Sequence, residues 1–330
     1  MLTFAVDLPL TNMLSRRHLR IKVMQIIYGC EQTENYAFEA AKVQLLQNIN
    51  KTHNLYLYVL LLLREVAGYV KQDKERRNRK YLPTEEDKNL NLQLYNNPLV
   101  QKLYTDTTFN EMVKREKLIP RIDPDVVKQL YREFSKDNDF LQYNLLENPT
   151  RNNHIDILKT LFTEFLLKQE IFISHIDEIF SNWEDDADIV TDTIKTLFYQ
   201  FGKKGAGPGL TIFAHPDDWN EKLEFCTDLL RFELKYNTEL LGLIQPQLEH
   251  WDVERLTQID IILLKMALCE FLYFPTIPTK VTINEYIEIA KLYSTPSSKT
   301  FVNGVLDKLM KILKDEGRIK KSGRGLVEFD

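Results

Sequence analysis

The stretch WDVERLTQIDIILLKMALCEFLYF, residues 251–274, indicates the fold class of this chain. Its apolar side chains recur every three or four residues, which is the spacing of one face of an α-helix. Pro275 and Pro278 follow it directly, and proline cannot continue a helix. We therefore predict one long helix over residues 251–274 that ends in a turn.

Two further helices are predicted downstream of this turn. Thr282 is followed three residues later by Glu285, which has the form of a capping box at the start of a helix. Residues 294–298 break the chain, and apolar residues at helical spacing resume at Phe301 and continue to Leu313. Three amphipathic helices with short loops predict a compact helical bundle.

The chain upstream of residue 251 is also predicted to be mostly helical, because few glycines and prolines interrupt it. Residues 81–150 are expected to hold turns and short helices, and residues 202–209 are expected to form a loop. Asp217 or Asp218 is expected to cap a helix that runs to Leu243. Other helices are predicted at 15–30, 36–49, 54–70, 152–182 and 187–201. The predicted fold class is all-α.

The composition argues against several classes of protein. A net charge of -5 means that any nucleic-acid site must be a local basic patch. Cys30, Cys226 and Cys269 lie far apart without CxxC spacing, which argues against a zinc site and fits a reducing cytoplasm. The most apolar run, residues 55–63, is much shorter than the ~20 residues of a membrane span. We expect a cytoplasmic protein with no membrane span and no secretory signal.

Motifs of enzymes are not found. GAGPG at residues 205–209 lacks the Lys-Ser/Thr of a phosphate loop, and His215 with Asp217 and Asp218 is more typical of a helix cap than of a metal site. The predicted protein is therefore not an enzyme and has no metal and no cofactor. An enzyme hidden in residues 70–220 would have no motif to support it.

Two motifs near the C-terminus resemble those of the NusB transcription-antitermination family. They are PTKVTINEYIEIAK at 278–291 and FVNGVLDK at 301–308, and they stand at the family's separation. LLKMALCE at 263–270 resembles the family's apolar helix ending in Glu, although the family often has Arg where this chain has Lys265. RRHLR at 16–20, followed by Gln25 and Tyr28, is similar to its arginine-rich first helix.

The resemblance implies NusB-like helical bundles with an additional helical insertion. It divides the chain into N-terminal helices at 1–70 that include the RNA-binding helix, an insertion at 71–215, a NusB-like bundle at 216–313 and a polar, flexible tail at 314–330. It also implies binding of single-stranded boxA-type RNA together with NusE, a small-subunit ribosomal protein, and RNA polymerase elongation complexes in ribosomal RNA operons as partners. The alternative is a protein-interaction scaffold that retains the bundle without RNA binding. Monomer and homodimer both stay open.

The first candidate RNA site lies on the predicted first helix. Arg16, Arg17 and Arg20 fall within one 100° arc of a helical wheel, beside the apolar stripe. Guanidinium groups there can fork onto phosphates and stack on bases. His18 and Lys22 lie on the other flank and are weaker candidates. The alternative is an ordinary solvated helix flank.

The second candidate site is the start of the last helix. Free backbone N–H groups near Ser298 and Lys299 would attract an anion, and Phe301 either stacks on a base or packs in the core. Asn303 is interpreted as a backbone cap or a buried hydrogen bond. Residues of the first motif are interpreted as structural: Thr282, Asn284 and Glu285.

The charge run KQDKERRNRK at residues 71–80 has two interpretations. It is either a basic loop that touches RNA or a solvated helix end. The second is favoured, because Asp73 and Glu75 dilute the positive charge.

Overall fold

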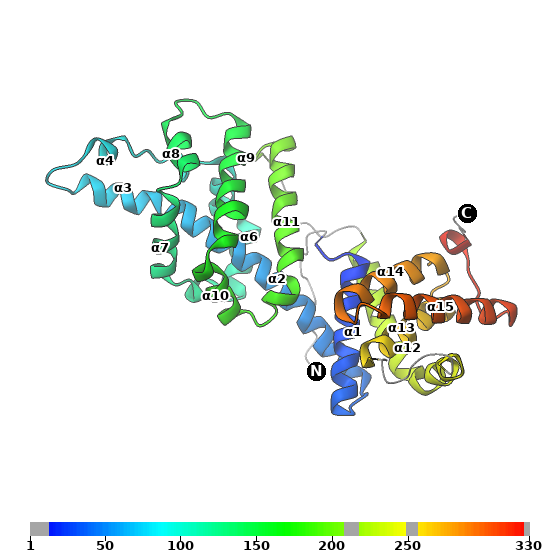
Figure 1. The fold of residues 1–330 in the computed structure, drawn as a ribbon. Coiled ribbons are helices and arrows are strands. Elements are labelled where there is room, and N and C mark those ends of the chain that lie inside the picture. The colour runs from blue at the N-terminus through cyan, green and yellow to red at the C-terminus, as the bar shows by residue number, and fades with distance from the viewer. Residues whose placement is uncertain (1–12, 208–217, 249–256, 327–330) are drawn as a thin grey trace. The chain divides into compact units, whose positions relative to one another are not determined.

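A computed structural model of the chain describes residues 13–207, 218–248 and 257–326, and every regular element in these ranges is a helix (Figure 1). The predicted all-α class is confirmed. None of the described helices is long and apolar enough to cross a membrane. The chain divides into two compact units, Met1–Met13 with Asn50–His215 (unit 1) and Leu14–Ile49 with Pro216–Asp330 (unit 2).

Unit 2 is built around one central helix, α13, Gln258–Tyr273, which packs against α1, α12, α14 and α15. Eleven residues of α13 are buried, on every side of the helix, as expected for a helix enclosed by others. The long predicted helix therefore ends where its prolines indicated, while residues 251–256 lie outside the described ranges. The helices around it are α1, Arg16–Thr33; α12, Trp219–Ile244; α14, Thr279–Tyr293; and α15, Ser298–Asp315.

Unit 1 consists mainly of short helices. Asn97 and Asp123, which precede prolines, accept hydrogen bonds from backbone N–H groups at the starts of α5 and α7, as Asn and Asp do at helix N-caps. The predicted helix over 152–182 is interrupted by a π-helix at Thr160–Phe165 and a 3₁₀ turn at Leu166–Lys168. The α-helices are α3, Val70–Asn78; α4, Glu85–Asn89; α5, Pro98–Thr105; α6, Thr107–Arg115; α7, Pro124–Phe134; α8, Asn138–Leu145; α9, Arg151–Lys159; α10, Glu170–Ile179; and α11, Trp183–Lys204.

The two helices predicted at 36–49 and 54–70 are one helix, α2, Phe38–Gly68. Polar residues lie between the two predicted segments, and the structure buries two of them, Thr52 and His53, completely. Thr52 Oγ1 donates a hydrogen bond to Asp186 Oδ2 of α11 at 2.7 Å. A polar turn with a buried partner can continue a helix, and the sequence pattern does not reveal that partner.

The capping box predicted at Thr282 and Glu285 is wrong. Helix α14 begins at Thr279 with Pro278 as its N-cap, so both residues lie inside the helix. Their side chains have partners on other helices, described below. A capping box is instead present at the start of α13, where Thr257 and Asp260 exchange hydrogen bonds of 3.1 and 3.2 Å with each other's backbone N–H groups.

Two other helix ends differ in detail from their predictions. Asp218 is the N-cap of α12, but its side chain makes an ion pair with Lys222 at 3.2 Å rather than a capping hydrogen bond. Asp217 and residues 208–209 lie outside the described ranges. Helix α11 extends three residues beyond the prediction and stops before Gly205, whose φ of 73° is the left-handed conformation that glycine adopts easily.

Candidate functional site

Arg20 of α1 is the anchor of the candidate site. Its Nε and Nη2 donate to Glu270 Oε1 and Oε2 of α13 at 2.7 and 2.9 Å, a bidentate pair. The side chains of Arg20 and Glu270 are 3% and 0% exposed. Thr282 Oγ1 and Tyr286 Oη of α14 also donate to Glu270, at 3.0 and 2.9 Å. The carboxylate therefore joins three helices through four hydrogen bonds.

The positive charge of Arg20 is maintained in the interior. Burial by itself would lower the pKa of Arg20, but the charge of Glu270 and its hydrogen bonds raise the pKa above its ordinary value. The ring of Phe225 lies 5.1 Å from the guanidinium carbon. The expectation of an exposed Arg20 is thus corrected, because a guanidinium enclosed by a carboxylate and rings has no open face for a phosphate. Lys22 is likewise buried, at 3% exposure.

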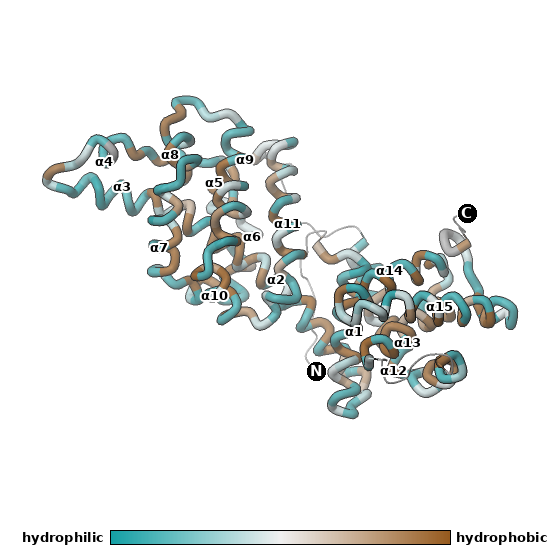
Figure 2. Tube along the Cα trace, in the orientation of Figure 1, coloured by the Kyte–Doolittle hydropathy of each residue, from teal (hydrophilic) through white to brown (hydrophobic). Residues whose placement is uncertain are grey.

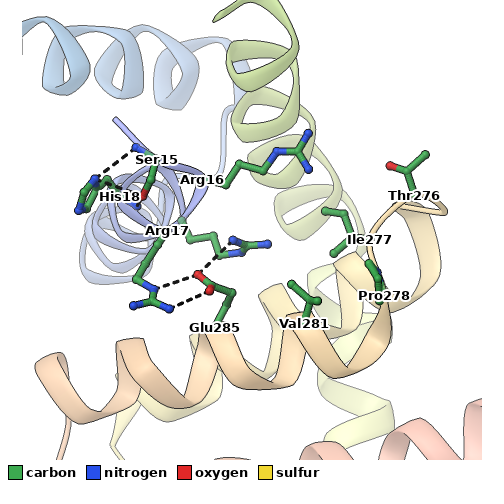
Figure 3. A pocket seen from close by; sticks show the side chains of 10 residues that line it. Ser15, Arg16, Arg17, His18, Thr276, Ile277, Pro278, Val281 and Glu285 are labelled. Atoms are coloured by element: carbon green, nitrogen blue, oxygen red, sulfur yellow. Dashed lines mark hydrogen bonds and ion pairs between the residues drawn. The ribbon is translucent and has the colours of Figure 1, made fainter. Parts of the chain in front are cut away.

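Arg17 occupies a different position from Arg20. Its Nε and Nη2 donate to Glu285 Oε2 and Oε1 at 2.9 and 2.8 Å, and its side chain remains 40% exposed (Figure 3). The hydrogen bond with Glu285 raises the pKa of Arg17. Burial would raise the pKa of Glu285, but Arg17 and the charge of Arg20 lower it overall. Arg17 therefore presents a charged, half-exposed guanidinium with one carboxylate partner.

Arg16 and His18 complete the exposed end of α1. Arg16 forms an ion pair with Glu221 of α12, and its guanidinium carbon lies 5.5 Å from the centre of the Phe225 ring. His18 Nδ1 lies 3.3 Å from both the backbone N and the Oγ of Ser15, which makes His18 part of the cap of α1. His18 is thus oriented by the helix end itself.

These side chains surround an open pocket of about 780 Å³ between the start of α1 and the turn that joins α13 to α14. Three arginines and one carboxylate contribute to its lining, and Ile277, Pro278 and Val281 supply an apolar wall. Figure 3 shows Arg16, Arg17 and Glu285 around this opening. The lining residues are Ser15, Arg16, Arg17, His18, Arg20, Thr276, Ile277, Pro278, Val281 and Glu285. Such a pocket can bind a ligand that has an anionic group near the arginines and a flat ring against the apolar wall.

The second candidate site, at the start of α15, is largely buried. Ser298 is 2% exposed and donates from Oγ to Asp260 Oδ2 at 2.9 Å, while its N–H donates to Thr295 O at 3.0 Å. Phe301 is 4% exposed, which agrees with the core-packing alternative. Lys299 is exposed at the start of α15. The N–H groups of Thr300 and Phe301 both donate to Ser297 O. The expected open anion site therefore reduces to Lys299.

The two candidate sites contact opposite ends of α13. Ser298 contacts Asp260 near its start, and Arg20 contacts Glu270 near its end. Ten residues of α-helix correspond to ~15 Å along its axis. The remaining residues of the two motifs, Asn284 and Asn303, are exposed on α14 and half-buried on α15.

Sequence reasoning missed the buried charges that organise unit 2. Lys265, 2% exposed, lies 2.8 Å from Glu233 of α12 and is also ion-paired with Glu31 of α1. A signal for both Glu270 and Lys265 was present, because each interrupts an otherwise apolar helix, and charges in such positions are seldom buried unpaired. Within the described ranges, no group of three or more His, Cys, Asp and Glu side chains is placed to hold a metal ion.

The fold and the pocket together define an all-helical protein with an open pocket lined by three arginines. The model of the NusB family matches residues 214–311, which contain α12, α13, α14 and most of α15. The chain is 46% identical over 107 residues to the transcription antitermination protein NusB of Salinibacter ruber, covering 32% of this chain and 67% of that protein. The chain therefore belongs to the NusB family.

Two further relatives carry the same description. The transcription antitermination protein NusB of Koribacter versatilis is 41% identical over 113 residues, 34% of this chain and 77% of that protein. That of Chloroherpeton thalassium is 47% identical over 86 residues, 26% of this chain and 41% of that protein. Helices α3 to α11 of unit 1 lie before the region matched by the family model.

Proposed function

We propose that this protein is a transcription antitermination factor that binds single-stranded boxA-type RNA through the pocket at the start of α1, together with NusE. It acts on RNA polymerase elongation complexes in ribosomal RNA operons, in the cytoplasm, and is not an enzyme. Membership of the NusB family and the descriptions of its relatives support this role. The main structural support is the guanidinium of Arg17, which lies half-exposed at the pocket and forms two hydrogen bonds with one carboxylate.

The chemistry of the pocket fits a single RNA strand. A guanidinium can fork onto a phosphate as it forks onto a carboxylate, so an incoming phosphate would replace Glu285 as the partner of Arg17. Arg16 supplies a second cation, and the apolar wall at Ile277 and Val281 supports an unstacked base. Arg20 acts as a positioning residue, because it holds α1 against α13. Lys299 is proposed as a separate phosphate contact.

The test is the binding of fluorescent boxA RNA to the full chain, with and without purified NusE, across a salt series. The double variant Arg16→Ala/Arg17→Ala should bind more weakly, and each phosphate interaction that it removes should reduce the slope of log affinity against log salt by about 0.7. Lys291→Ala is the control, because Lys291 is a cation of α14 with 45% exposure that does not line the pocket. Equal binding by the double variant and the wild type would refute the site.

The alternative is a protein-interaction scaffold that does not bind RNA. It is favoured by one observation: of the four cationic candidates on α1, Arg20 and Lys22 are buried and Arg17 already has a carboxylate partner. NusE binding without any effect of boxA RNA, at every salt concentration, would support this alternative.

A further inference from the structure

Residues Val70–Asn89, here termed the basic arm, carry a dense group of positive charges in unit 1. Between Lys71 and Lys80 there are six cations and two acids, a net charge of +4. The whole arm carries seven cations and five acids, a net charge of +2 in a chain whose net charge is -5. Only Val70 and Asp73 of α3 are buried. Figures 1 and 2 show α3 as a hydrophilic helix that leads to a turn, from which α4 returns. The arm thus exposes most of its surface.

Two buried carboxylates hold the arm in shape. Asp73, with a side chain 3% exposed, accepts hydrogen bonds from Arg76 and from Arg77, the latter at 2.7 Å. Asp87, on the returning segment, is also 3% exposed and accepts from Lys80 at 2.8 Å. Asp87 therefore connects α4 to the end of α3. These two acids therefore pair with three of the arm's cations, Arg76, Arg77 and Lys80.

Several cations remain accessible despite these pairs. The side chain of Arg76 is 62% exposed and that of Lys80 is 45% exposed. Among the residues that the structure describes, Lys74 and Arg79 have no ion-pair partner, and Arg79 is exposed. Positive charges on an exposed, only partly neutralised helix attract a flexible polyanion.

The turn of the arm presents an aromatic ring. Tyr81 is 97% exposed and Leu82 is 81% exposed, directly after Lys80. An almost fully exposed ring has both faces open, and an aromatic face beside cations is how single-strand binders stack a base while they hold its phosphates. The ring and the charges therefore point to the same class of ligand.

We propose that the basic arm is a second binding surface, for single-stranded nucleic acid, separate from the pocket at the start of α1. Lys74 and Arg79, with the exposed parts of Arg76 and Lys80, contact phosphates, and Tyr81 stacks on a base. The charge of the arm favours this polyanion over an apolar protein or lipid partner, for which Leu82 alone would provide little area. The arm lies before the region matched by the family model, so the proposal does not rest on the proposed function.

The stacking contact is tested on the full chain with fluorescent oligouridine of about 12 nucleotides and oligothymidine of the same length, which both lack boxA. Tyr81→Ala should weaken binding about five- to a hundredfold, and Tyr81→Leu should weaken it similarly because leucine has no aromatic face. The matched control is Tyr199→Ala on α11, since Tyr199 is 60% exposed and Lys203 Nζ lies 4.5 Å from its ring centre. The control should bind like the wild type.

The phosphate contacts are tested by Lys74→Ala/Arg79→Ala. The slope of log affinity against log salt should fall by about 0.7 for each phosphate interaction that the variant removes, and Lys136→Ala, which removes a cation that is 67% exposed, should leave it unchanged. Binding of either oligonucleotide with these reduced slopes supports the proposal, and preference for oligouridine would add a contact to the 2′-hydroxyl.

Three results would overturn the proposal: no binding of either oligonucleotide by the wild type, wild-type binding by Tyr81→Ala, or wild-type binding by Tyr81→Leu. The last result would indicate that an apolar contact at residue 81 is sufficient and that no aromatic ring stacks on a base. Arg17→Ala separates the two RNA surfaces, because it should impair boxA binding and leave the effect of Tyr81→Ala on oligouridine intact.

Discussion

Arg20 and Glu270 are 250 residues apart in the chain, yet they form a bidentate ion pair with almost no exposure to solvent. The pair joins α1 to α13, and the hydroxyls of Thr282 and Tyr286 add α14 to the same carboxylate. The half-exposed Arg17, three residues earlier on α1, owes its position beside the pocket to this anchor.

Loss of one partner of this pair should strongly destabilise unit 2. Glu270→Ala leaves Arg20 buried without a counter-charge, and we expect a loss of about 3–5 kcal/mol in the free energy of unfolding, measured by urea denaturation. Thr282→Val, which removes one hydrogen bond to the same carboxylate, should cost only about 1 kcal/mol. Arg20→Met/Glu270→Leu should be more stable than Glu270→Ala. A loss below that of Thr282→Val would contradict the assigned role of Glu270.

The ion pair of Arg17 and Glu285 should make the free energy of unfolding depend on pH. The pKa of Glu285 in the folded protein lies below its ordinary value of 4.5, so the unfolded chain binds the proton more readily. The stabilisation is therefore complete above pH 4.5 and is lost as the pH falls through the lower, folded pKa. Urea denaturation at several pH values should show that Glu285→Gln is less stable than the wild type near pH 7. The difference should shrink in acid, and a constant difference would argue against this linkage.

Removal of the Glu285 charge should strengthen RNA binding, although it lowers stability. If a phosphate replaces Glu285 on Arg17, then Glu285→Gln removes a competitor and a repulsive charge, and boxA affinity should rise several-fold at low salt. Glu239→Gln is the control, because Glu239 is paired with Arg318 and does not line the pocket. A weaker affinity for Glu285→Gln would mean that Glu285 orients Arg17 for binding instead.

Two histidines should make unit 1 less stable in mild acid. His154 Nδ1 lies 2.7 Å from Tyr143 Oη, and His175 Nε2 lies 2.6 Å from Tyr58 Oη. Burial lowers the pKa of each ring below 6.5, so the unfolded chain binds protons more readily. Stability should therefore fall as the pH drops below 6.5 toward the folded pKa values. The double variant His154→Asn/His175→Asn should show a shallower fall. Denaturation is followed by the fluorescence of Trp183 in α11, with Trp219 and Trp251 changed to Phe in every protein compared.

The sequence allowed several features to be predicted correctly. Helical periodicity and few breaking residues indicated the all-α class, and Pro275 and Pro278 marked the end of α13. The motifs at 278–291 and 301–308 indicated the family, which the matches to relatives confirm. These features depend on local backbone preferences and on residue order, both of which can be read from the amino-acid sequence.

Other predictions needed contacts between distant residues. The sequence placed Arg16, Arg17 and Arg20 on one arc, but only the packing of α13 and α14 against α1 separates the buried Arg20 from the half-exposed Arg17. Thr282 and Glu285 have capping-box spacing, yet Glu270 and Arg17 provide their partners. The continuous helix α2 depends in the same way on Asp186, more than a hundred residues further along the chain.

The sequence by itself thus determined the all-α class, the end of α13 and the family, because these follow from short-range sterics and residue order. The tertiary structure decided which charges are buried, which remain exposed and which carboxylate each cation contacts. The physical reason is that the energy of a charge depends on burial and on its nearest opposite charge, and both are set by residues that are distant in sequence and become neighbours only when the helices pack.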